Sequence, residues 1–186
     1  TEYHNASGSA LTETYTMDYP LDTFAFEHNG RAFTAHIYTD DDQDPPWQRE
    51  DGHGPVRELR GSTDYSSRPA KRPGERFLMW DRNWGLAYDW QAACKLARAD
   101  GWNAEPYDAP HRIERAVQAD FDRMRTYAEG EWSYVGVCVT PDDDEDADPY
   151  MHALWGIESD SPDYLREVAC ELADECEPAY VHEFTS

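Results

Sequence analysis

Apolar and polar residues alternate in two short stretches near the start of the chain, residues 24–26 and 33–37, which flank Asn29 and Gly30. A period of two is that of a β-strand with one buried face. The Asn-Gly pair favours the tight type I′ turn that joins two antiparallel strands. We therefore expect a β-hairpin here, preceded by a polar and aperiodic segment, residues 1–20, that should be flexible.

Longer apolar runs predict further strands. Residues 132–139 are apolar on both faces and hold three valines, which is typical of a central strand. Residues 150–157 follow an acidic loop and should form its antiparallel neighbour. Residues 77–80 predict another strand, and Tyr180, Val181 and Phe184 indicate one more near the end of the sequence.

Three segments repeat apolar residues at the helical spacing of three and four positions. Each is bounded by residues that favour helix ends, namely a capping side chain or a proline at the start and a glycine or a proline at the end. These boundary residues are Asp89 and Gly101, Pro110 and Gly130, and Ser161 and Pro178.

The order of these elements predicts an α+β fold, with a mostly antiparallel sheet and about three helices packed on one face. Residues 40–75 are rich in Asp, Pro, Gly, Ser and Arg and offer few side chains to bury, so we expect one long loop there. A length of 186 residues suits one domain, which we place at residues 21–186.

The composition is that of a folded chain. Hydrophobic residues make up 39% of the sequence and aromatic residues 13%, which is too many for a disordered acidic chain. No apolar run approaches the roughly 20 residues that span a membrane, and the first residues lack the basic and apolar regions of a signal peptide. We expect a soluble, cytoplasmic protein.

Charge is distributed unevenly along the chain. The formal charge is −23, and residues 141–186 hold 15 acidic residues against a single basic one, Arg166. Residues 41–140, in contrast, hold 18 acidic and 14 basic residues. Because like charges repel, a segment of this kind is typical either of a protein adapted to high salt or of one whose field attracts a basic partner.

The candidate binding residues are the carboxylates of the 142–148 loop, of the segment after it, and of the third helix. They are Asp142, Asp143, Asp144, Glu145, Asp146, Asp148, Glu158, Asp160, Asp163, Glu167, Glu171, Asp174 and Glu175. Acids that recur every four positions on a helix lie about 6 Å apart along its axis. Duplex DNA carries a charge about every 1.7 Å, so the helix could imitate DNA only together with the loop. The alternative is that these carboxylates simply form a solvated helix face.

No pattern in the sequence predicts a metal or a cofactor. The aspartates that alternate between positions 142 and 148 are similar to a calcium loop, but Ala147 and Ala153 stand where an EF-hand needs Gly and Glu. The cysteines lack the short paired spacings of zinc sites. We expect free and mostly buried thiols at Cys94, Cys138, Cys170 and Cys176.

We expect no catalysis, because the sequence has no glycine-rich phosphate loop, no H-E-x-x-H and no G-x-S-x-G. Two alternatives stay open. Cys138 with His152 or His182 could form a nucleophile and its base. Glu158 and Asp160 could form an acid–base pair, although both also suit the start of a helix.

The densest basic stretch lies in the middle of the chain. Its residues are Arg57, Arg60, Arg68, Lys71, Arg72 and Arg76. The net charge of the molecule would oppose direct binding of nucleic acid at ordinary salt. We therefore expect these cations to pair with the acidic face of the same molecule.

Residues 88–102, which include YDWQA and DGW, and residues 154–160, LWGIESD, resemble stretches of small uncharacterised acidic proteins of bacteriophages and other mobile elements. In charge and aromatic content the chain resembles the DNA mimics among them. The resemblance implies a protein that occupies the basic nucleic-acid-binding groove of a host defence complex, as an anti-CRISPR or anti-restriction inhibitor. The alternative is a salt-adapted α+β protein with a generic acidic surface.

Overall fold

The computed structural model describes residues 19–49, 52–61, 69–102, 111–144 and 146–176. Within these ranges, seven strands form two antiparallel sheets and four segments are helical, which confirms the predicted α+β class. The strands divide between two sheets, whereas the sequence pattern suggested one. No helix in these ranges is both long and apolar enough to cross a membrane.

The first sheet has four strands. In spatial order they are β1 (Asp22–His28), β2 (Arg31–Thr39), β6 (Tyr134–Pro141) and β7 (Ala153–Glu158). The predicted hairpin is confirmed, since β1 pairs with β2 and the turn residues Asn29 and Gly30 have φ of 51° and 79°. β6 is the predicted central strand, and β7 is its antiparallel neighbour.

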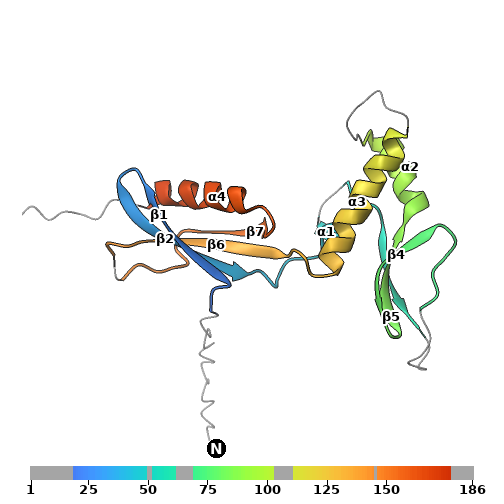
Figure 1. Cartoon of the computed structure of the whole chain (residues 1–186), viewed down its shortest axis with the longest axis horizontal. Coiled ribbons are helices and arrows are strands. Elements are labelled where there is room, and N and C mark those ends of the chain that lie inside the picture. The colour runs from blue at the N-terminus through green and yellow to red at the C-terminus, as the bar shows by residue number, and fades with distance from the viewer. Residues whose placement is uncertain (1–18, 50–51, 62–68, 103–110, 145, 177–186) are drawn as a thin grey trace, which may run out of the picture.

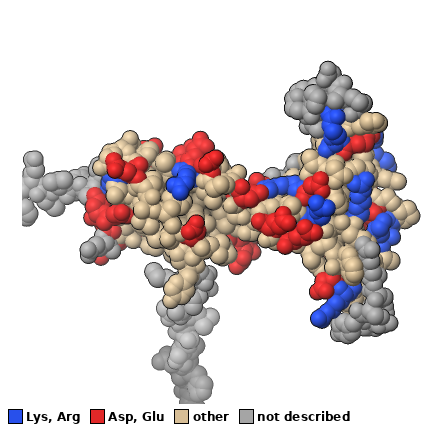
Figure 2. Space-filling model, in the orientation of Figure 1, with Lys and Arg blue, Asp and Glu red and all other residues tan. Residues whose placement is uncertain are grey.

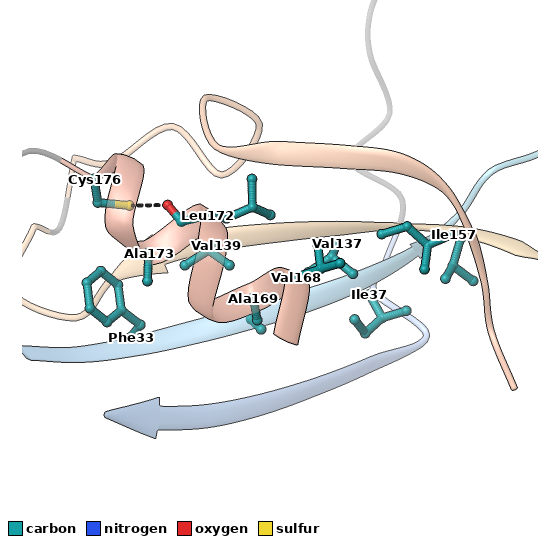
Figure 3. Packing of buried hydrophobic residues seen from close by; sticks show 12 residues of the cluster. Phe33, Ile37, Val137, Val139, Ile157, Val168, Ala169, Leu172, Ala173 and Cys176 are labelled. Carbon is teal, nitrogen blue, oxygen red and sulfur yellow. Dashed lines mark hydrogen bonds between the residues drawn. The ribbon is translucent and has the colours of Figure 1, made fainter. Parts of the chain in front are cut away.

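One helix, α4 (Pro162–Glu175), covers a face of this sheet (Figure 1). Its buried residues meet alternate residues of the strands, as Figure 3 shows for Val168 and Leu172 against Val137 and Val139. The last turn ends with Cys176, whose thiol donates to the carbonyl oxygen of Leu172 at 3.5 Å. Burial of these apolar side chains, at roughly 25 cal/mol per Å², is the main stabilising contribution of this core.

The second sheet has three strands, in the order β3 (Val56–Arg60), β5 (Trp84–Asp89) and β4 (Glu75–Asp81). It packs against α2 (Trp90–Asp100) and α3 (Arg112–Ala128) around a core of its own, which includes Leu86, Tyr88 and Met124. The predicted ends of α2 are confirmed: the side chain of Asp89 accepts from the amide of Ala92, and Gly101 has φ of 72°. α3 ends before Gly130, which has φ of 77°.

The second sheet and its helices are inserted between two neighbouring strands of the first. β2 and β6 pair directly, with Thr39 opposite Val135, and the amide of Asp40 donates to the carbonyl oxygen of Tyr134 at 3.1 Å where the strands separate. We call residues 19–39 and 134–176 the terminal lobe and residues 40–133 the inserted lobe. Figure 1 shows the two lobes side by side.

The expected long loop at residues 40–75 is wrong. This segment contains α1 (Pro46–Arg49) and β3, which pairs with β5. The sequence pattern did not predict β3 because few of its residues are apolar, so no alternation of apolar and polar residues is visible. Leu59 is buried, but Arg57 pairs instead with the buried carboxylate of Glu75 at 2.9 Å. The predicted strand near Val181 and the N-terminal segment 1–18 lie outside the described residues.

Candidate functional site

The two lobes differ sharply in charge. The terminal lobe holds 15 acidic residues and two basic ones, Arg31 and Arg166, whereas the inserted lobe holds 19 acidic and 14 basic residues. Figure 2 shows the same division, with most of the visible Lys and Arg over the inserted lobe. The uneven charge along the chain is therefore an uneven charge between two structural units.

On α4, the predicted binding residues lie on the outer face. Val168 and Leu172 turn toward the sheet and are buried. The carboxylates on the other side are exposed, and they are Asp163, Glu167, Glu171, Asp174 and Glu175. The helical period thus separates the apolar stripe from the acidic one, as the sequence predicted.

The 142–148 loop also exposes its carboxylates, with Glu145 outside the described residues. The exposed residues are Asp142, Asp143, Asp144, Asp146 and Asp148. Two contacts with β2 fix the start of the loop: Arg31 donates to Asp143 at 2.6 Å, and the hydroxyl of Thr34 donates to Asp142 at 2.9 Å. The guanidinium of Arg31 lowers the pKa of Asp143 through this hydrogen bond.

The loop and the C-terminal end of α4 meet around a hollow of about 460 Å³. Asp144, Asp146 and Asp148 line it from the loop, and Glu175 lines it from the helix. Val139 and Met151 are among its apolar lining residues. The structure therefore brings together two groups of carboxylates that lie about 30 positions apart in the sequence. We call this set, with the outer carboxylates of α4, the acidic face.

Glu158 and Asp160 have a different role. Both pair with Arg123 of α3, a residue of the inserted lobe, and the distance from its guanidinium to Glu158 is 2.7 Å. Arg123 also lies over the ring of Trp132 at 3.7 Å. The hydrogen bond from Arg123 lowers the pKa of Asp160. These two carboxylates connect the lobes, and the guanidinium of Arg123 offsets part of their charge within the molecule.

The geometry opposes the two catalytic alternatives. Cys138 is fully buried, and burial raises the pKa of its thiol to about 11, so the thiolate is scarce near neutral pH. The residue directly opposite it on β2 is His36, not His152, and His182 lies outside the described residues. Arg123 binds both Glu158 and Asp160, and its hydrogen bond lowers the pKa of Asp160, which therefore has no proton to donate near neutral pH.

The structure describes four free cysteines, of which Cys94, Cys138 and Cys176 are buried. This confirms the expected free and mostly buried thiols. Among the described residues, no group of three or more His, Cys, Asp or Glu side chains is arranged to hold a metal ion.

Where the structure describes it, the basic stretch does not pair with the acidic face, contrary to the expectation. Its described contacts are with the inserted lobe itself: Arg57 binds Glu75, Arg60 approaches Glu58 at 3.4 Å, and Arg76 lies over the ring of Trp90 at 3.2 Å. The reason is topological. Arg57, Arg60 and Arg76 belong to β3 and β4 of the second sheet, whereas the acidic face belongs to the terminal lobe. Arg68 lies outside the described residues.

Sequence reasoning missed a polar group in the inserted lobe. The carboxylate of Asp120, only 8% exposed, accepts from His53 Nδ1 at 2.7 Å, from the amide of Gly54 at 2.8 Å and from the hydroxyl of Tyr88. Burial raises the pKa of Tyr88, which stays a hydrogen-bond donor. One signal was present: Asp120 falls at helical spacing within the apolar face of α3.

His53 also lines a cavity of about 510 Å³ at the end of α2. Its other lining residues are Trp47, Gly52, Pro55, Leu96, Asp100 and Trp102. Trp47 stands edge-to-face against Tyr127 of α3 at 5.5 Å. The lining thus combines aromatic and aliphatic side chains with one imidazole and one carboxylate.

A comparison with models of known protein families finds no match. Comparisons with curated proteins and with solved structures also find none.

Proposed function

We propose that this chain is a non-catalytic acidic binding protein, whose acidic face docks into the basic nucleic-acid-binding groove of a partner protein. The observation that supports this most is the convergence of the 142–148 loop with the C-terminal half of α4, which gathers exposed carboxylates at one end of the terminal lobe. The resemblance to phage-encoded DNA mimics suggests the partner class, a CRISPR or restriction complex, which makes this chain an anti-defence inhibitor.

The charge density of the acidic face is consistent with this role. Carboxylates every four residues along α4 are about 6 Å apart, which is sparser than the charges of duplex DNA. The loop supplies further carboxylates beside the helix end. Among the described carboxylates there, only two have a cationic or imidazole partner in an ion pair: Asp143 lies 2.6 Å from Arg31, and Asp174 lies 2.6 Å from His28. A field of one sign over this end would speed association with a basic groove.

General salt adaptation is the second candidate. It predicts acidic residues over all exposed surfaces, because its purpose is to hydrate the whole molecule. The inserted lobe instead has nearly balanced charge, and several of its arginines form ion pairs or lie on aromatic rings. The concentration of charge on one lobe favours a partner over a solvent adaptation.

The proposal is tested by reversing charge on the acidic face. The variant Glu167→Lys, Glu171→Lys and Glu175→Lys is compared with a control that changes net charge equally on the inserted lobe, Asp81→Lys, Glu129→Lys and Glu131→Lys. All six residues are exposed. The readout is inhibition of target-DNA binding by purified CRISPR effector and restriction complexes, measured by competition with duplex DNA at several salt concentrations.

Inhibition that weakens with salt, survives in the control and is lost in the acidic-face variant supports the proposal. Equal loss in both variants would indicate a nonspecific effect of net charge. Inhibition that survives reversal of the acidic face would refute the role of that surface.

Thermal unfolding followed by circular dichroism distinguishes the salt-adapted alternative. A binding protein should unfold cooperatively in dilute buffer, whereas a protein of a salt-loving organism should require molar potassium chloride to fold.

A further inference from the structure

The cavity at the end of α2 is lined by both aromatic and polar side chains. Trp47 lies in α1, Trp102 directly follows the end of α2, and Leu96 adds an aliphatic side chain from α2. Sites that bind small groups are concavities in which a few polar atoms are placed among apolar side chains. At about 510 Å³ the cavity is within the size range of such sites.

His53 is held in place by the buried carboxylate of Asp120. Its Nδ1 is hydrogen-bonded to one oxygen of this carboxylate, and the amide of the next residue, Gly54, donates to the other oxygen. Gly54 lies directly on the ring of Tyr88, where an added Cβ would come within 2.2 Å of the ring. The imidazole is therefore oriented before any ligand arrives, as in sites whose histidine is fixed by a carboxylate.

The electrostatics of the cavity favour a cation. Asp100 contributes an exposed carboxylate to its lining, and no Lys or Arg is among the lining residues that the structure describes. The cavity lies at the C-terminal end of α2, where the backbone amides of Gly101 and Trp102 turn back to the carbonyl of Ala97. The C-terminal end of a helix is the negative end of its dipole, and indole faces attract cations.

We infer that this cavity binds a planar cation, a guanidinium or an aromatic amidinium, through the rings of Trp47 and Trp102 and the carboxylate of Asp100. The inference does not rest on the acidic face, since it concerns the other lobe and a separate set of residues. Two sources could supply this chemistry: an arginine side chain of a polypeptide or a small aromatic cation.

The test uses the full chain and two probes of the same shape, benzamidine, which is positively charged, and benzamide, which is neutral. Binding is followed through the indole N–H signals in nuclear magnetic resonance, assigned with Trp47→Phe and Trp102→Phe. We expect saturable shifts at these two signals with benzamidine and binding of benzamide weaker by roughly tenfold, the contribution of one charge–aromatic and carboxylate contact.

A conservative variant separates binding from folding. Asp100→Asn should weaken benzamidine binding by about threefold to tenfold, while Asp81→Asn, a change of another exposed carboxylate, should leave it unaltered. N-acetyl-arginine amide is the second arm: shifts at the same two indoles identify an arginine side chain as a source, and shifts with benzamidine alone identify a small aromatic cation. Equal binding of benzamidine and benzamide, or no saturable shift at either indole with any probe, overturns the inference.

Discussion

A single residue of the terminal lobe, Gly156, makes two hydrogen bonds to the inserted lobe. It lies at the irregularity in the pairing of β7 with β6, with φ of 79°. Its amide donates to the carboxylate of Asp40 at 2.8 Å, and its carbonyl oxygen accepts from Arg49 at 3.0 Å. Arg49 also lies over the ring of Tyr134 at 4.6 Å. A terminal-lobe residue thus binds the first residues of the inserted lobe.

The variant Gly156→Ala should destabilise the protein by about 2–3 kcal/mol, because it combines a strained positive φ with a close contact. An added Cβ would lie 2.5 Å from the guanidinium of Arg49. The matched control is Gly130→Ala, at φ of 77° with no atom within 4 Å of the added Cβ, which should cost only about 1 kcal/mol. Urea unfolding measures both, and equal losses would show that Arg49 simply moves aside.

The cysteines give a second prediction at the residue scale. The pKa of the Cys138 thiol is raised to about 11 by burial, and burial also raises the pKa of Cys176. A raised pKa leaves little thiolate at pH 7.5, so iodoacetamide should modify the half-buried Cys170 first and leave Cys138 unmodified until the protein unfolds. Mass spectrometry of the alkylated protein measures this, and rapid native modification of Cys138 would revive the nucleophile hypothesis.

At the scale of an element, α4 is a helix whose exposed face opposes its own stability. Glu167, Glu171 and Glu175 stand four residues apart, and like charges at this spacing repel. The helix persists because its other face, with Val168 and Leu172, is buried against the sheet. An acidic stripe that costs stability is easier to understand as a binding surface than as a structural device.

Glu171→Lys should therefore stabilise the protein by about 0.5 to 1 kcal/mol at low salt, because two repulsive pairs become attractive. The gain should shrink in 1 M salt, which screens exposed charges. Glu171→Gln, which only removes the repulsion, should give about half the gain. Denaturant unfolding at both salt concentrations measures the effect, and a loss of stability in Glu171→Lys would show that the stripe makes favourable contacts.

At the scale of the whole molecule, the protein has two separate cores, one in each lobe. The lobes meet where the chain passes between them, through the contacts of Arg49 and Arg123 and through the rings of Trp132 and Tyr134, which pack against Tyr127 of α3. Partly exposed ion pairs contribute little to stability, typically about 0–1 kcal/mol, so the few rings make up most of this connection. Because the connection is small beside the two cores, each lobe should unfold largely by itself, although one continuous domain was predicted from the length of the chain.

Hydrogen exchange tests this independence. Leu172→Ala and Met124→Ala each delete a buried side chain, one in each core, and each should cost about 2–5 kcal/mol. Leu172→Ala should raise exchange in β1, β2, β6, β7 and α4 alone, and Met124→Ala in β3, β4, β5, α2 and α3 alone. Equal acceleration in both lobes from either variant would show a single cooperative unit.

The sequence determined the elements whose signals lie within a few neighbouring residues. The alternation around Asn29, the caps at Asp89 and Gly101, and the apolar stripe of α4 each depend on contacts between residues about two to four positions apart. The exposure of the α4 carboxylates followed from the same periodicity. The α+β class followed from the order of the elements.

Only the tertiary structure decided which of these elements lie together. The pairing of β2 with β6 places the whole inserted lobe between neighbouring strands, β3 is stabilised by its pairing with β5 rather than by its own pattern, and Arg123 takes Glu158 and Asp160 out of the acidic face. The binding of Asp120 to His53 likewise joins residues 67 positions apart. Such contacts depend on how the complete chain packs, and no local window of sequence records that packing.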